Sequence, residues 1–147
     1  MEPFNLQEFI PYRLARLSGR VSRSLAQTYR KEGLATVHWR ILAQLADNPG
    51  LTAVEVGRRI DLEKSKISRA LAAMEAKGWL ERRRDPSDQR AAIITLTAPG
   101  WALFHRIRPM AQAWEAKLLD TLPAETRQQL LALIESLEQR LDQTESG

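Results

Sequence analysis

A chain of 147 residues with no cysteine, two histidines and a net charge of +4 is expected to form one domain. The missing cysteines exclude disulfides, thiol redox chemistry and thiolate zinc sites, and two histidines are too few to favour a transition-metal site. The charge is uneven: residues 58–90 hold ten Lys and Arg against six Asp and Glu, whereas residues 111–147 hold three against seven. This asymmetry indicates a polyanionic partner for the middle of the chain.

The N-terminal sequence lacks a basic stretch followed by an apolar one, and no run of apolar residues is long enough to cross a membrane. A cytoplasmic protein without membrane contact is therefore expected.

Helical spacing dominates the first sixty residues. Apolar residues from Ile10 to Tyr29 recur every three or four positions and predict an amphipathic helix over 10–29. A second helix is expected over about 36–46, ended by the breakers of "DNPG" at 47–50. Thr52 and Glu55 have capping-box spacing, which predicts a short helix over 53–60.

Asp61 is expected to cap the next helix, "LEKSKISRALAAMEAK", which Gly78 ends. On a helical wheel of about 100° per residue, Ile67, Leu71 and Met74 share one face and are expected in the core. Ser65 and Arg69 lie on the opposite face with three alanines, and Lys66 and Ser68 flank it.

Alternating apolar residues follow Gly78. "WLERRR" and "AAIITLT" are expected to form antiparallel strands around the turn sequence "DPSDQ". Helix resumes near Pro99 and is expected to run to about residue 121, with a kink at Pro109. A last helix begins near Pro123, with an apolar seam at Leu130, Leu133, Ile134, Leu137 and Leu141.

This order predicts a mainly α fold with a small β-hairpin wing, a winged helix-turn-helix flanked by N- and C-terminal helices. A helix in the major groove presents its N-terminal residues to base edges. Arg69 suits a bidentate contact with guanine, and Lys64, Ser65, Lys66 and Ser68 suit bases or phosphates.

Residues 51–100 resemble the MarR family of winged helix-turn-helix regulators. The resemblance is carried by "KSKISR", "MEAKGWLERR" and "DPSDQRAAIITLT", above all by Asp88, Arg90, Leu96 and Thr97. Lys66 and Ser68 depart from the usual family residues, so the family's base preference does not transfer. Trp79 replaces an aliphatic residue and is expected to pack at the base of the wing.

The resemblance implies a single MarR-like domain over 1–147, with dimerisation helices at 10–31 and 101–142 and a DNA-binding lobe at 36–98. It implies a homodimer on a pseudo-palindromic double-stranded operator, with Arg90 entering the minor groove and Asp88 orienting it. Arg84 is favoured for a phosphate contact, and Arg82 and Arg83 stay open between phosphate contact and solvated charge.

Relatives commonly bind a small organic anion, an aromatic acid or an acyl-CoA, beside the dimerisation helices. The residues here in the corresponding segments are Tyr12, Arg13, Arg16, His38, Trp39, Arg40, Trp101, Phe104 and His105. The resemblance thus predicts a ligand-responsive repressor with no cofactor. A winged-helix protein-interaction module and a DNA-binding regulator without an effector remain alternatives. No catalytic constellation is evident, so no enzymatic activity is expected.

Overall fold

The computed structural model describes residues 1–85 and 87–146, and of Asp85, Asp88, Gln89 and Arg90 it describes the backbone without the side chains. The chain divides into two compact units, Met1–Ala111 and Gln112–Gly147. The expected single domain over 1–147 stays a prediction. No helix of the described chain is long and apolar enough to cross a membrane.

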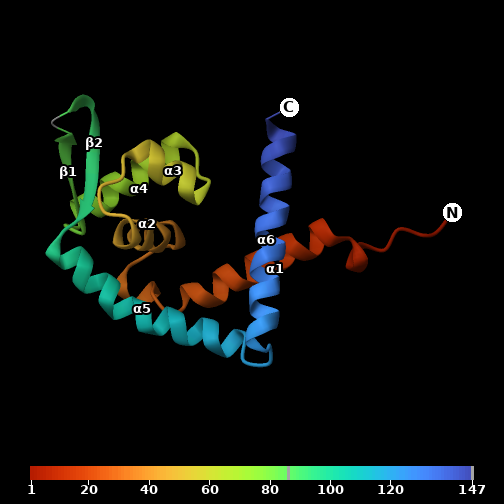
Figure 1. Ribbon diagram of the computed structural model, residues 1–147. Helices are drawn as coiled ribbons and strands as arrows, with labels where there is room; N and C mark the ends of the chain where they lie inside the picture. The colour runs from red at the N-terminus through yellow and green to blue at the C-terminus, as the bar shows by residue number, and fades with distance from the viewer. Residues whose placement is uncertain (86, 147) are drawn as a thin grey trace. The chain divides into compact units, whose positions relative to one another are not determined.

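The elements follow the predicted order (Figure 1). They are η1 (Leu6–Glu8), α1 (Ile10–Ala26), η2 (Arg30–Glu32), α2 (Thr36–Asp47), α3 (Ala53–Ile60), α4 (Lys64–Ala76), β1 (Leu80–Asp85), β2 (Asp88–Leu96), α5 (Ala98–Leu118) and α6 (Ala124–Glu145). A mainly helical chain with one antiparallel hairpin confirms the predicted winged helix-turn-helix.

The core joins the helix-turn-helix to the root of the hairpin. Its buried side chains include Ile41, Leu42 and Leu45 of α2, Val56 of α3, Ile67, Leu71 and Met74 of α4, Leu80 and Ile94 of the hairpin, and Leu103 and Ile107 of α5. The three α4 residues are those placed inward by the helical wheel, so the opposite face of α4 is left at the surface.

Two local expectations were wrong. The first helix ends at Ala26, before the predicted residue 29, because Tyr29 turns into the core and its hydroxyl donates to Thr36 Oγ1 at 2.9 Å. Asp61 does not cap the following helix. It is the left-handed C-cap residue of α3, with φ of 53°, and α4 begins only at Lys64.

The predicted capping box of α3 is confirmed. Glu55 N–H donates to Thr52 Oγ1 at 3.2 Å, and Thr52 N–H donates to Glu55 Oε1 at 3.1 Å. These bonds with Thr52 lower the pKa of Glu55. A carboxylate whose pKa is lowered on folding stabilises the folded state above its unfolded pKa, and this contribution is lost as pH falls through the folded pKa. The box fixes the entry to the helix-turn-helix at neutral pH.

The hairpin pairs Leu80 with Leu96 at its root and continues to Arg84 opposite Ala92. Its register then shifts, because Asp85 pairs with Asp88 and leaves Gln89, Arg90 and Ala91 between two paired positions of β2. The second strand thus begins three residues before the predicted "AAIITLT", and Arg90 belongs to an irregular strand segment. Outside the hairpin, Ile94 N–H donates to Leu51 O at 2.8 Å.

The C-terminal unit contains the end of α5, a turn and α6. Helix α5 runs through Pro109 without interruption. Arg127 closes the turn, because its guanidinium donates to the carbonyls of Leu119 and Leu122 at 2.9 and 3.2 Å. No described residue of α6 is buried within this chain, including the leucines of its predicted seam.

Candidate nucleic-acid interface

Helix α4 presents a polar, cationic face. Lys64, Ser65, Lys66, Ser68 and Arg69 are all exposed. Ser65 Oγ donates to Glu63 Oε1 at 3.1 Å, and Arg69 Nε makes a long 3.5 Å contact with the carbonyl of Ser65 in its own helix. Within the described residues, neither lysine nor Arg69 has an ion pair with a carboxylate. The cations of this face are therefore available to an external anion.

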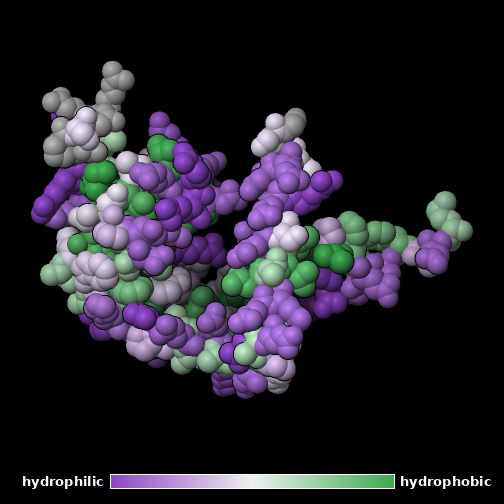
Figure 2. Space-filling model, viewed as in Figure 1, coloured by the Kyte–Doolittle hydropathy of each residue, from purple (hydrophilic) through white to green (hydrophobic). Residues whose placement is uncertain are grey.

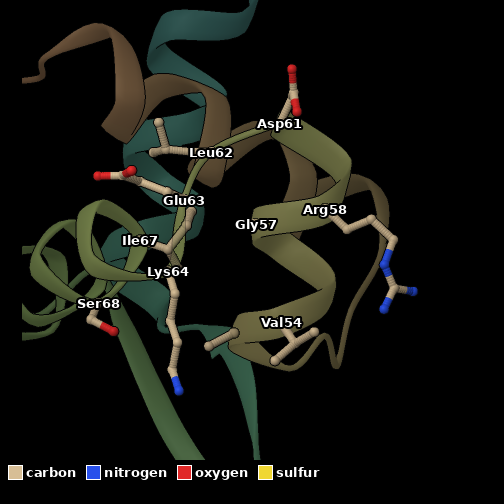
Figure 3. Close-up of a pocket in the computed structure, with 10 residues that line it drawn as sticks. Val54, Gly57, Arg58, Asp61, Leu62, Glu63, Lys64, Ile67 and Ser68 are labelled. Carbon is tan, nitrogen blue, oxygen red and sulfur yellow. The ribbon is translucent and has the colours of Figure 1, made fainter. Parts of the chain in front are cut away.

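A groove separates α3 from the first turns of α4 (Figure 3). Its volume is about 580 Å³, and Gly57 and Ile67 form part of its wall. Lys64 and Ser68 reach it from α4 and Val54 from α3, while Asp61 points away at the opposite end of the view. Val54 is 64% exposed, so the mouth combines an apolar side chain with polar and cationic ones.

The three consecutive arginines of β1 have different surroundings. Arg82 Nε lies 3.7 Å from Glu75 Oε1 of α4, and Arg83 Nη2 lies 2.9 Å from Glu81 Oε1. Arg84 is exposed and has no ion pair with the described residues. Among the side chains that the structure describes, Arg84 is therefore the arginine of β1 without a carboxylate partner, whereas Arg82 and Arg83 already face carboxylates.

The predicted minor-groove pair lies partly outside this description. The backbones of Asp88 and Arg90 are in β2, at the irregular end of the hairpin, and their side chains are among those not described. Their roles stay predictions.

Trp79 lies where α4, the wing and α5 meet. Its N–H donates to Met74 O at 3.0 Å and its carbonyl accepts from Thr97 N–H at 3.1 Å. The start of α5 also packs closely against the backbone of Trp79, because a Cβ added to Gly100 would lie 2.0 Å from Trp79 O. Trp79 is half-buried against the core, as expected for packing at the base of the wing.

His38 and Lys77 flank Trp79. The His38 ring lies edge-on to the indole at 6.4 Å, and Lys77 Nζ lies 4.8 Å from its centroid. Lys77 Nζ also donates to Gly33 O at 3.1 Å, and His38 Nδ1 accepts from Ala35 N–H at 3.3 Å. Burial, and then the charge of Lys77, lower the pKa of His38.

Four of the proposed effector residues form an aromatic cluster. Trp39 stacks on Phe104 at 6.2 Å, Phe104 meets Trp101 edge-on at 6.2 Å, and Trp101 stacks on His105 at 5.8 Å. His38 is separated from this cluster, since it faces Trp79 and Lys77.

The other predicted effector residues have different contacts. Arg40 donates to Ser22 Oγ of α1 at 3.3 Å, and Arg13 donates to Gln7 O at 3.1 Å. Tyr12 is half-buried and Arg16 exposed in the first half of α1. No hydrogen bond, ion pair or ring contact between described residues joins Tyr12, Arg13 or Arg16 to the aromatic cluster, so the effector site as a whole stays a prediction.

Sequence reasoning missed the pairing of Glu75 with Arg82 and the position of Lys77 above Trp79. Lys77 and Trp79 are separated by one residue, and Gly78 turns the chain between them with φ of 79°. The combination of lysine, glycine and tryptophan could have indicated this cation–π contact.

A helix-turn-helix followed by a basic hairpin, with a cationic recognition face, defines the class of winged helix-turn-helix proteins. Residues 32–91 match the sequence model of the MarR family, and a solved relative more than 30% identical over most of the chain shows that the chain belongs to it. A transcriptional regulator of the MarR family from Silicibacter pomeroyi is 31% identical, with a TM-score of 0.79 and 90% of each chain covered.

Two further relatives are informative. The transcriptional repressor CouR, solved on a 23-mer DNA duplex, is 26% identical, with a TM-score of 0.84 and coverage of 94% of this chain and 98% of that one. The homoprotocatechuate degradative operon repressor of Escherichia coli is 28% identical over 119 residues, which span 78% of this chain and 80% of that protein.

Proposed function

We propose that the chain is a homodimeric repressor of transcription that binds a pseudo-palindromic operator in double-stranded DNA and is released by a small organic anion. The observation that carries the DNA-binding part is the exposed face of α4, where Lys64, Lys66 and Arg69 have no carboxylate partner among the described residues. A bare cationic helix face next to a basic hairpin suits a major groove and its flanking phosphates.

The relatives support repression. The solved relative CouR is named a transcriptional repressor and is bound to a DNA duplex, and the E. coli relative is named the repressor of a degradative operon. In the bacteria that carry such relatives the chromosome lies in the cytoplasm, so we place the protein there.

Apolar surface on α1 supports a dimer. Ile10, Leu14 and Leu17 are 65%, 46% and 56% exposed, and green hydrophobic surface runs along the N-terminal stretch leading into this helix (Figure 2). At the far end of this helix, Leu25 and Ala26 pack on the core of their own chain.

Helix α6 gives separate support for the dimer. Leu130, Ile134, Leu137 and Leu141 repeat at intervals of three and four residues and are between 41% and 57% exposed. Apolar rows of this spacing are buried when two helices pair, and twofold symmetry matches a pseudo-palindromic site.

The aromatic cluster supports an aromatic or acyl-CoA-type effector. Trp39, Trp101 and Phe104 are only half-buried, so part of this aromatic cluster lies at the surface, and Arg40 on the same helix as Trp39 supplies a cation for a carboxylate. The name of the E. coli relative connects it with the degradation of homoprotocatechuate, an aromatic acid.

The test of this function is selection of a binding site from random duplex DNA, followed by titration at several salt concentrations. We expect one enriched inverted repeat, bound by two chains per duplex, with affinity falling steeply as salt rises. Failure to enrich any sequence, with no binding to duplex DNA at low salt, would contradict the proposal and favour a protein-interaction module. Binding unaffected by a panel of aromatic acids and acyl-CoA esters would favour a regulator without an effector.

The wing arginines give a graded prediction. Arg90→Ala is expected to weaken operator binding several-fold while leaving the thermal unfolding midpoint unchanged.

Arg84→Ala is expected to lower the slope of log affinity against log salt by about one for each half-site, because a phosphate contact releases its counterion. The matched control for Arg84→Ala is Arg83→Ala, which removes the same charge from a side chain already paired with Glu81. Equal salt slopes for the Arg83 and Arg84 variants would contradict the assignment.

A further inference from the structure

His38 belongs to a cluster that ties the start of α2 to the root of the wing. Its ring bonds to Ala35 N–H in the turn before α2 and lies edge-on to Trp79 between α4 and β1. Lys77, the C-cap residue of α4, spans the same two segments, since it covers Trp79 and donates to Gly33 O. The side chains of His38, Lys77 and Trp79 thus connect two backbone segments that are far apart in sequence. Lys77 and Gly33, for example, are separated by 44 residues.

The position of Trp79 gives this cluster its importance. Hydrogen bonds of its backbone fix the end of α4 through Met74 and the end of β2 through Thr97. In the proposed complex α4 and the wing contact DNA as two separate elements, and simultaneous contact with both grooves requires a defined geometry between them. A group that holds Trp79 therefore influences both halves of the interface.

The hydrogen bond from Ala35 N–H requires an unprotonated Nδ1 on His38. The charged groups around the ring come from α4. Lys77 is one of them. The others are Lys66 and Arg69, which together with His38 line a shallow groove of about 380 Å³. The other neighbours are the backbone before α2 and the uncharged indole, while Glu32 of η2 faces Arg106 of α5 at 3.3 Å. A proton on His38 would break the bond to Ala35 N–H and place a second positive charge close to Lys77.

We propose that His38 is a positioning residue for DNA binding. Its neutral ring holds the root of the wing in place, and its protonation lowers the affinity for the operator. The proposal rests on the proposed DNA-binding function and goes beyond it by naming a proton as a regulator. The pKa of His38 is lowered from its ordinary value of 6.5 by burial and then by the charge of Lys77, which agrees with this geometry because both favour the neutral ring. Because the pKa of His38 is lower in the folded than in the unfolded protein, the neutral ring also stabilises the fold above pH 6.5. This contribution is lost as pH falls from 6.5 through the folded pKa.

The experiment is a titration of operator DNA with the full-length protein between pH 5.5 and 8.0 at constant ionic strength. Wild-type affinity is expected to fall by about threefold or more on acidification, because linkage allows at most about tenfold per pH unit for each group. His38→Gln keeps an acceptor for Ala35 N–H and does not titrate. It should bind as tightly as wild type at pH 8.0 and lose the pH dependence.

The chain offers a matched control, because His105 is its only other histidine. His105→Gln should keep the wild-type profile. Lys77→Gln removes the like charge, so the midpoint of the profile should move to higher pH, a shift that a merely structural role would not produce. Retention of the wild-type pH profile in His38→Gln would overturn the proposal. A rise in wild-type affinity on acidification would also overturn it, and would show that protonated His38 faces DNA as a cation. Absence of operator binding at every pH would instead refute the proposed function.

Discussion

Replacement of Arg69 by alanine is expected to abolish the preference for operator over random DNA while leaving a weak, salt-dependent affinity. Arg69 is the one arginine on the exposed face of α4, and its guanidinium end is unpaired among the described residues. A bidentate pair with guanine contributes about 1–3 kcal/mol of discrimination, and a symmetric dimer loses it in both half-sites. The measurement is the ratio of dissociation constants for operator and scrambled duplex at one salt concentration.

Arg69→Lys sharpens this test. Lysine keeps the positive charge but not the planar fork of donors, so the salt slope should survive while the preference falls. Specificity retained in Arg69→Ala would show that another element reads the bases. A lost salt slope in Arg69→Lys would show that Arg69 acts through phosphate.

Gly100→Ala is expected to cause the largest loss of stability among single-methyl changes near the wing. The added Cβ would lie 2.0 Å from the carbonyl oxygen of Trp79 and 3.0 Å from its carbon. Because both contacts are with backbone, the start of α5 must move away from the root of the wing. Overpacking of this kind costs about 1–3 kcal/mol or more.

Gly78→Ala is the matched control, because it adds the same methyl group on the other side of Trp79. Gly78 has φ of 79° and open space around a hypothetical Cβ, so only the backbone conformation is penalised, by about 1–2 kcal/mol. Denaturant midpoints, measured at one protein concentration, should fall further for Gly100→Ala than for Gly78→Ala. The reverse order would show that α5 yields easily at its contact with Trp79.

Local patterns predicted the helix-turn-helix well. The capping box of Thr52 and Glu55 and the inward row of Ile67, Leu71 and Met74 depend on spacing along one helix, which a sequence displays directly. Asp61 was misassigned because its residue type suits both a helix N-cap and a left-handed position. The chain bends at Asp61 and α4 starts later. Gly57 then lies so near Ile67 and the carbonyl of Leu62 that an added Cβ would fall 3.2 Å from each, and neither helix pattern displays this approach.

The site was less predictable than the fold, because its details depend on partners far apart in sequence. No spacing rule relates His38 to Trp79 or Gly33 to Lys77. His38 was grouped with Trp39 because both lie in a segment that corresponds to the effector region of MarR-family relatives. Successive residues of a helix point about 100° apart, so these two side chains face different surroundings. The pairing of Arg82 with Glu75 was likewise hidden, since it depends on how β1 leaves α4.

The backbone hydrogen bond between Ile94 and Leu51 makes the two edges of the hairpin differ in whether a neighbouring backbone segment covers them. One edge of β2 is occupied at its root by the segment that follows α2, whereas the outer edge of β1 meets no strand of the described chain. An open strand edge can template pairing between copies of a protein and so lead to aggregation. This strand carries Arg82, Arg83 and Arg84. The first two face Glu75 and Glu81, so Arg84 supplies the like charge that opposes the association of two approaching copies. The arginine that, in our proposal, contacts a DNA phosphate would therefore also disfavour strand pairing between two copies of the protein.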